Sequence, residues 1–160
     1  MVVTHDIPYN EPFRYLIMDP IDEDLAYAYI MGRDGGTPLV FDDGTTAEPP
    51  FGKTDNGRWQ YVWQRDRMAR MIDFHNRMQG TTMEVLHADE CSLLWRRQEK
   101  GIVAINKCGE PRQITVDTRF KFKWHHPYQD SLTDGPPIEI DGPRVTFDLP
   151  GRSAQMWSAL

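Results

Sequence analysis

Two absences in the sequence exclude whole classes of protein before any motif is considered. No apolar run approaches the roughly 20 residues that cross a bilayer, so we do not expect a membrane protein. Positive charge is scarce relative to negative charge, because 18 Lys and Arg stand against 24 Asp and Glu, for a net charge of -6. Binding to a phosphate backbone needs clustered cations, so nucleic acid is not expected as a partner.

The length of the chain, its first residues and the spacing of its histidines limit the kinds of fold and site that we expect. With 160 residues the chain suits one ordinary domain or two small modules, and it is too short for a complete (β/α)8 barrel of about 250 residues. Residues 1–9 have neither the basic start nor the apolar core of a signal peptide, so no export signal is expected. The histidines show no metal-ligand spacing, because His125 and His126 would point to opposite faces of a strand, while His75 and His87 lie in different segments.

The first quarter of the sequence has the pattern strand, helix, strand. Residues 2–4 form a short β-branched run, and the polar pair at residues 5–6 follows at its exit. Residues 20–31 have apolar side chains at helical spacing, with Asp19 as N-cap. Residues 39–41 then indicate a second buried strand. This order implies a parallel crossover.

A long connection and a second helix come next. Residues 44–57 are rich in Gly, Pro, Thr and Asp, which indicates a loop near a binding surface. Residues 59–78 predict a helix, and Gly80 supplies its stop. One face of this helix is expected to pack in the core, namely Met68, Met71, Ile72, His75 and Met78.

After Gly80 the apolar pattern changes from helical to alternating. Short runs separated by Gly, Pro, Asp and Asn predict an antiparallel sandwich or barrel. The runs are residues 83–86, 91–95, 102–105, 114–116, 120–124, 138–140, 145–149 and 154–157. The sequence therefore predicts two modules, residues 1–80 and residues 81–160.

Several segments carry a family resemblance through their order along the chain. Residues 2–6 read Val-Val-Thr-His-Asp, residues 24–29 read DLAYAY and residues 35–40 read GGTPLV. Residues 101–106 read GIVAIN, and PGRSA follows at residues 150–154. Together these segments resemble the α-amylase family (glycoside hydrolase family 13): the motif ending the seventh barrel strand, the seventh helix, the eighth strand and the C-terminal domain. The resemblance covers essentially the whole chain.

The resemblance implies both a fold and an activity. The fold is α+β, with the last two β/α units of a (β/α)8 barrel in residues 1–80 and an antiparallel Greek-key β-sandwich in residues 81–160. The implied activity is retaining hydrolysis of α-1,4-glucans such as starch and glycogen. Asp6 matches the family's catalytic Asp that stabilises the transition state. His5 matches the histidine that binds the sugar at the cleavage position.

The same resemblance implies that part of the machinery lies elsewhere. The family's nucleophile and general acid sit on barrel strands four and five, ahead of the segments found here. Retaining chemistry needs both carboxyl groups, so the isolated chain is expected to be inactive. The family's calcium ligands come from that same region, so no metal or other cofactor is predicted. The family is mostly secreted, whereas residues 1–9 carry no signal peptide, so localisation stays open.

Other interpretations of the polar residues remain open. His5 and Asp6 also suit a loop-capping pair, in which Asp6 accepts backbone N–H bonds. Glu11, Asp42 and Asp43 are further carboxylates, but no sequence period fixes their spacing to Asp6, so loop solvation accounts for them better. A non-catalytic carbohydrate-binding or structural module is the alternative to an enzyme.

The expected ligand is an α-glucan oligosaccharide or polysaccharide. Trp59 and Trp63 follow the predicted loop and are the candidates for stacking on sugar rings, whereas most tryptophans are expected in the core. The two predicted barrel strands would have open edges, which predicts a homo-oligomer or association with the missing barrel segment. A solvated face is expected for the clustered cations Arg65, Arg67, Arg70, Arg96, Arg97 and Lys100.

The two cysteines, Cys91 and Cys108, lie on successive predicted strands. If the turn from Gln98 to Gly101 is a two-residue hairpin loop, the cysteines oppose each other in a non-hydrogen-bonded pair, where a disulfide is accessible. A glycine bulge at Gly101 would instead shift the pairing by one residue and send them to opposite faces. A disulfide suits the mostly secreted family, and both registers stay open.

Overall fold

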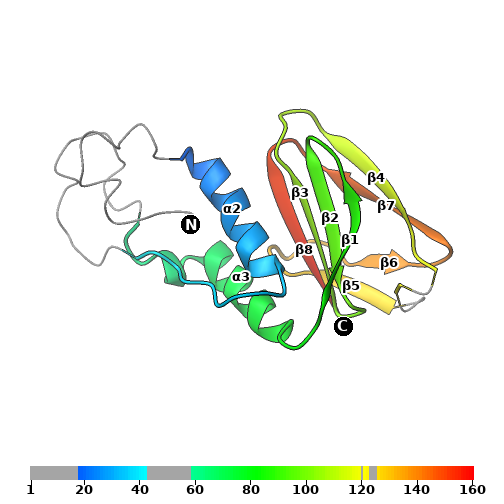
Figure 1. Cartoon of the computed structure of the whole chain (residues 1–160), viewed down its shortest axis with the longest axis horizontal. Helices are drawn as coiled ribbons and strands as arrows, with labels where there is room; N and C mark the ends of the chain where they lie inside the picture. The colour runs from blue at the N-terminus through cyan, green and yellow to red at the C-terminus, as the bar shows by residue number, and fades with distance from the viewer. Residues whose placement is uncertain (1–17, 43–58, 120, 123–125) are drawn as a thin grey trace.

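The computed structural model of the chain describes residues 18–42, 59–119, 121–122 and 126–160 (Figure 1). The predicted strand at residues 2–4 and the predicted loop at residues 44–57 lie outside these ranges. No helix within the described residues is long and apolar enough to cross a membrane. The helical elements are α2 (Pro20–Gly32), the 3-10 helix η2 (Val62–Gln64) and α3 (Asp66–Arg77). The strands are β1 (Met83–Ala88), β2 (Ser92–Arg97), β3 (Gly101–Asn106), β4 (Arg112–Asp117), β5 (His126–Asp130), β6 (Ile138–Ile140), β7 (Arg144–Leu149) and β8 (Ser153–Ala159).

Helix α2 begins where the sequence predicts. The carboxylate of Asp19 accepts a hydrogen bond from the backbone N–H of Ile21, at 3.1 Å. Pro20 takes the first helical position, where its missing N–H costs nothing. The helix ends as Arg33 turns to extended backbone, with φ -80° and ψ 166°. The prediction of this helix is confirmed.

The predicted second strand at residues 39–41 is wrong. No residue from 37 to 42 is in a strand, and the Leu39 side chain is 87% exposed. A strand needs hydrogen-bonded neighbours, and none of the described strands pairs with this segment. The backbone N–H of Phe41 instead donates to the hydroxyl of Tyr27, at 3.2 Å. The predicted parallel crossover is therefore not seen in the described part of the chain.

The second predicted helix is shorter than expected. Tyr61 has a left-handed backbone, with φ 52°, and Arg65 is extended, with φ -66° and ψ 133°. Tyr61 separates a turn from η2, and Arg65 separates η2 from α3, so α3 begins only at Asp66. The predicted apolar face is confirmed, because Met68, Met71, His75 and Met78 are buried and the half-buried Ile72 packs against the same core. Phe74 is buried as well.

Within the described residues, eight antiparallel strands form two sheets. The larger has the order β1-β2-β3-β8-β5-β6, and the smaller consists of β4 and β7. Seven of the eight predicted runs overlap a strand. The strand predicted at residues 120–124 is wrong, because its described residues 121 and 122 lie in a turn and a bend. The strand in this part of the chain is β5, which begins only at His126. Pro127 within β5 weakens the sequence signal, since proline removes a ladder donor.

The larger sheet is covered on both faces. Successive residues of a strand point to opposite faces, and both sets are apolar here. Trp95, Val103 and Met156 face the helices, where they share one core with α2 and α3. Leu94, Ile102 and Trp157 face the opposite way and form a second core with β4 and β7. Figure 1 shows this order of layers, with the helices on one side of the larger sheet and β4 and β7 on the other.

One of the cations predicted on a solvated face is buried instead. The Arg97 side chain is 2% exposed, and it points from β2 to the ends of both helices. Its guanidinium donates to the carbonyl oxygens of Arg33, Met78 and Thr81, at 2.6, 2.9 and 2.9 Å. The prediction failed because the last carbonyls of a helix need donors, and a sequence does not show which side chain reaches them.

Candidate functional site

A cluster of polar and aromatic side chains lies at the N-terminal end of α2. We call it the α2 cluster, defined as Glu23, Asp24, Tyr27, Trp59 and Arg67. Glu23 is only 7% exposed, and its carboxylate accepts a hydrogen bond from Trp59 Nε1 at 3.0 Å. Burying a carboxylate is costly unless it is hydrogen-bonded, so this bond fixes Trp59 against the helix.

Tyr27 lies one helical turn after Glu23 and holds a second segment. Its hydroxyl accepts the backbone N–H of Phe41, and burial raises the pKa of the Tyr27 phenol. The rings of Phe41 and Trp59 meet edge to face, with centroids 6.1 Å apart. Helix α2 therefore fixes Phe41 and Trp59 beside each other, although 17 residues separate them in sequence.

Asp24 and Arg67 tie the same end of α2 to α3. The guanidinium donates to both carboxylate oxygens, at 2.7 and 2.8 Å, and also to the carbonyl of Ala154 in β8, at 3.1 Å. Such a two-point pair fixes orientation as well as distance. It borders a hollow of about 250 Å³, lined by Pro20, Glu23, Asp24, Tyr27, Val62, Arg65, Arg67 and Met68.

The chemistry open to this cluster is binding and positioning. Both oxygens of Asp24 are engaged by Arg67, so this carboxylate is not poised as a nucleophile. The hollow is lined by charged side chains and by Tyr27, and the Glu23, Asp24 and Tyr27 oxygens are already hydrogen-bonded within the protein. Within the described residues, no group of three or more His, Cys, Asp or Glu side chains is arranged to hold a metal ion.

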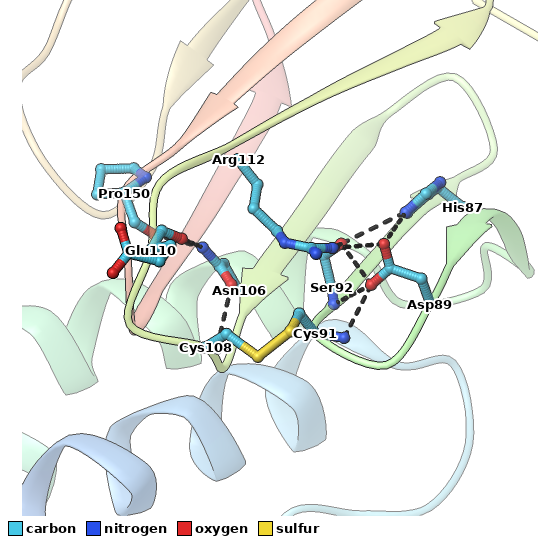
Figure 2. Close-up of a disulfide and its surroundings, with 9 residues drawn as sticks. All are labelled: His87, Asp89, Cys91, Ser92, Asn106, Cys108, Glu110, Arg112 and Pro150. Atoms are coloured by element: carbon cyan, nitrogen blue, oxygen red, sulfur yellow. Dashed lines mark hydrogen bonds and ion pairs between the residues drawn. A yellow bond between two sulfur atoms is a disulfide. The ribbon is translucent and has the colours of Figure 1, made fainter.

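A second polar cluster contains the residue types of a hydrolytic triad. Asp89 Oδ2 lies 3.2 Å from His87 Nε2, and Ser92 Oγ lies 3.3 Å from the same nitrogen (Figure 2). Asp89 also accepts from the backbone N–H groups of Cys91 and Ser92, at 2.8 and 2.7 Å. These two bonds are the main reason that the pKa of Asp89 lies far below its usual range.

The geometry of this second cluster excludes a catalytic triad. A triad needs the acid on one ring nitrogen and the nucleophile on the other, whereas here both approach His87 Nε2. Ser92 is 3% exposed, and its hydroxyl also bonds directly to Asp89, at 2.9 Å. Arg112 closes the group by pairing with Asp89 at 2.6 Å. The cluster stabilises the turn between β1 and β2.

The disulfide between Cys91 and Cys108 is confirmed, with 5.2 Å between the Cα atoms. Both predicted registers are wrong, because Arg97 pairs with Gly101 and a three-residue loop joins β2 to β3. The strand pairing ends at Ser92 and Asn106, so the cysteines lie just beyond the ladder. The Asn106 carboxamide oxygen accepts the N–H of Cys108 at 3.1 Å, which curls the chain and brings Cys108 back to Cys91 (Figure 2).

Only some of the site residues predicted from the sequence belong to the described part of the chain. His5 and Asp6 lie outside the described residues, as do Glu11 and Asp43. Asp42 is half-buried at the end of a described segment, and it does not line the hollow of the α2 cluster.

The aromatic and charged residues singled out in the sequence differ in burial and in their partners. Trp59 is buried and belongs to the α2 cluster, whereas the Trp63 side chain is 52% exposed. Arg67 is engaged by Asp24, and Arg96 is engaged by Glu84 at 2.6 Å, so neither lies on a purely solvated face. Sequence reasoning missed Glu23 and Tyr27, because an acid and a tyrosine one turn apart are common on exposed helices.

Comparisons with known proteins show what the chain is similar to. No protein-family model matches the sequence. The chain is 40% identical over 152 residues to an α-amylase of Aeromonas hydrophila, which covers 94% of this chain and 32% of that protein. An Anoxybacillus α-amylase has a similar fold, with TM-score 0.65, 15% identity, and 92% of this chain and 35% of that chain covered. An α-amylase of Geobacillus thermoleovorans, solved with acarbose, also has a similar fold, with TM-score 0.56 and 16% identity. The match covers 92% of this chain and 36% of that chain.

The two helices and antiparallel sheets thus have the fold of the C-terminal domain of α-amylases, a class of glycoside hydrolase. The resemblance to the α-amylase family drawn from the sequence is confirmed, and the chain is a homologue of the Aeromonas hydrophila α-amylase. The chain spans about a third of the length of that relative.

Proposed function

We propose that the chain forms the C-terminal third of an α-amylase-type glycoside hydrolase that acts on α-1,4-glucans. The observation that carries this proposal is the 40% identity to an α-amylase, which extends over 94% of the chain. In this proposal residues 1–80 contribute the end of the barrel, including its last two helices, and residues 81–160 form a Greek-key domain. The bound acarbose of the Geobacillus thermoleovorans α-amylase supports a carbohydrate ligand.

Asp6 and His5 carry the proposed chemistry of this chain. Asp6 stabilises the positively charged sugar of the transition state, and His5 binds the sugar at the cleavage position. The nucleophile and the general acid come from the two thirds of the enzyme that this chain does not span. No step of the reaction is completed by the chain alone.

The α2 cluster has a positioning role in this proposal. Tyr27 and Glu23 hold Phe41 and Trp59, which belong to two separate segments of the chain. Both segments are thereby fixed to the same end of α2.

The test is a chimera of full length. The 152-residue region of the Aeromonas hydrophila α-amylase that aligns with this chain is replaced by this chain, and starch hydrolysis is measured as reducing ends released. We expect activity in the chimera, none in the isolated chain, and a loss of about 100-fold or more in kcat for the chimera with Asp6→Asn. Asp42→Asn is the control and should retain activity.

Two results would contradict the proposal. A folded chimera without activity would show that residues 1–80 do not complete the site. Full activity after Asp6→Asn would remove Asp6 from the mechanism.

A non-catalytic carbohydrate-binding module is the second candidate, and the exposed Trp63 ring favours it. Retardation of the isolated chain in an amylose-containing gel, lost on Trp63→Ala, would support this candidate. Binding of that kind by a chain whose chimera is inactive would make the module the better description.

A further inference from the structure

The Cys91–Cys108 disulfide is connected to helix α2 by a short series of direct contacts. Cys108 lies in the irregular segment between β3 and β4, and its backbone carbonyl accepts the N–H of Arg152 at 2.8 Å. The guanidinium of Arg152 pairs with Asp22 at 2.8 Å and with Asp19 at 3.8 Å. A single residue therefore joins the segment fixed by the disulfide to the start of α2.

The start of α2 depends on the two carboxylates that Arg152 contacts. Asp19 caps the helix through its side chain, and its backbone carbonyl accepts the N–H of Glu23 at 3.0 Å, which closes the first turn. Asp22 lies in that turn, where a negative charge complements the partial positive charge of the helix end. Glu23 belongs to the α2 cluster, so order in this turn also supports the bond between Glu23 and Trp59.

The backbone at Cys108 needs outside contacts to stay in place, because its segment is in neither a helix nor a strand. The Asn106 carboxamide accepts the N–H of Cys108 at 3.1 Å and donates to the carbonyl of Pro150 at 3.0 Å (Figure 2). Gly109 lies against Gly151, since a Cβ at residue 151 would overlap the Gly109 carbonyl. The disulfide adds a covalent tie to these contacts. The position of the Cys108 carbonyl thus depends in part on the bridge.

A reductant can reach the bridge from the surface. Both cysteines are half-buried, and Cys91 lines a hollow of about 430 Å³ between α2 and the turn that joins β1 to β2. A small dithiol that enters this hollow attacks a disulfide sulfur as its thiolate. The S–S bond then breaks and each cysteine becomes a thiol, while the dithiol supplies the two electrons and two protons and closes to its own disulfide.

We infer that the Cys91–Cys108 disulfide is a redox-sensitive switch that controls the order of the first turn of α2 through Arg152. The intact bridge holds the Cys108 carbonyl against the N–H of Arg152, and Arg152 holds the two carboxylates. Reduction removes the covalent tie, so the segment and Arg152 move more and the first turn of α2 opens more often. The Arg152–Asp22 pair is exposed, so the expected change is a few-fold in local opening and not the loss of the helix. The switch acts within this chain and does not rest on the proposed function.

Amide hydrogen exchange, read by NMR at single residues with and without dithiothreitol, tests the switch in the full chain. The N–H groups of Arg152 and Glu23 report on the two ends of the connection. The N–H of Ser131, which donates to the carbonyl of Met156 in β8, is the internal control. Exchange through local opening does not depend on low concentrations of urea, which separates it from global unfolding. Reduction should speed local exchange about three-fold at Arg152 and Glu23 and leave Ser131 unchanged.

Substitutions test the part played by Arg152. Arg152→Met removes the ion pairs but keeps the bridge, so Glu23 should exchange about three-fold faster in the oxidised protein, and reduction should add nothing there. Arg119→Met, at another exposed ion pair, is the matched control and should respond to dithiothreitol as the wild type does. The double variant Cys91→Ala, Cys108→Ala should exchange like the reduced wild type in either condition.

Several results would overturn the inference. If mass spectrometry shows the bridge intact after dithiothreitol treatment of the folded chain, the bridge is not a switch. If reduction speeds exchange at Arg152 alone, or at Glu23 equally in Arg152→Met, then Arg152 is not the connection. If no amide responds, the bridge and the helix are independent. If Ser131 accelerates together with the other two amides, the bridge supports the whole fold and not the first turn of α2.

Discussion

Trp95 and Arg97 donate hydrogen bonds to the same oxygen, the carbonyl of Gly32 at the end of α2, at 2.9 and 3.0 Å. The two donors are two residues apart on β2 and so point to the same face of the sheet. A Cβ at residue 32 would lie 2.6 Å from Trp95 Cζ2 and 3.0 Å from Val103 Cγ2. Glycine at this position lets the end of the helix reach both donors.

We predict that Gly32→Ala destabilises the protein by about 2 kcal/mol, because the added methyl group pushes the helix end away from Trp95 and Arg97. Urea unfolding measures the change. Gly109→Ala is the control, since a Cβ there meets nothing within 4 Å, and it should cost little. Equal stability of the two variants would show that the close approach is not required.

Replacing Arg97 is predicted to cost more. Arg97→Met removes donors from four carbonyls, of Gly32, Arg33, Met78 and Thr81, and should destabilise by about 3 kcal/mol. Arg97→Lys keeps the charge but lacks the planar fork, so it should recover only part of the loss. Arg119→Met, at an exposed ion pair, should be close to neutral in the same urea titration. Wild-type stability in Arg97→Met would contradict the role of this side chain.

The disulfide is predicted to contribute about 3 kcal/mol, because it closes a loop of 17 residues in the unfolded chain. Urea unfolding with and without dithiothreitol should show this difference in the wild type. The double variant Cys91→Ala, Cys108→Ala should be insensitive to the reductant. Two alkylated thiols in the unreduced, denatured protein would show that the bridge does not form.

Acid should destabilise the protein in part through Asp89. Its folded-state pKa is lowered, chiefly by the N–H groups of Cys91 and Ser92. A lowered pKa stabilises the folded state at pH above the unfolded value of about 3.9, and this stabilisation is lost as the pH falls below it. The unfolding free energy of Asp89→Asn should therefore fall less steeply than that of the wild type from about pH 4 downward. Parallel curves for the two proteins would refute the assignment.

The sequence determined the elements whose signals are local. Asp19 and Pro20 mark the start of α2 within one turn, and the alternating runs after Gly80 predict seven of the eight strands. Capping and alternation depend on neighbours in sequence, so one sequence suffices to find them. The order of motifs along the chain also determined the family resemblance, which the 40% identity to an α-amylase confirms.

Only the tertiary structure decided the features that depend on distant partners. Residues 39–41 have the composition of a strand but pair with no described strand. Pro127 weakens the sequence signal of β5, which is nevertheless a strand because it pairs with β6 and β8. Arg97 has the sequence context of a surface cation, yet its side chain donates to carbonyls at the ends of two helices. The cysteines were matched by their spacing, but the pairing of β2 and β3 set another register, and the turn at Asn106 brought the sulfurs together. In each case the deciding contact joins residues far apart in sequence, and its free energy exists only once the chain has folded.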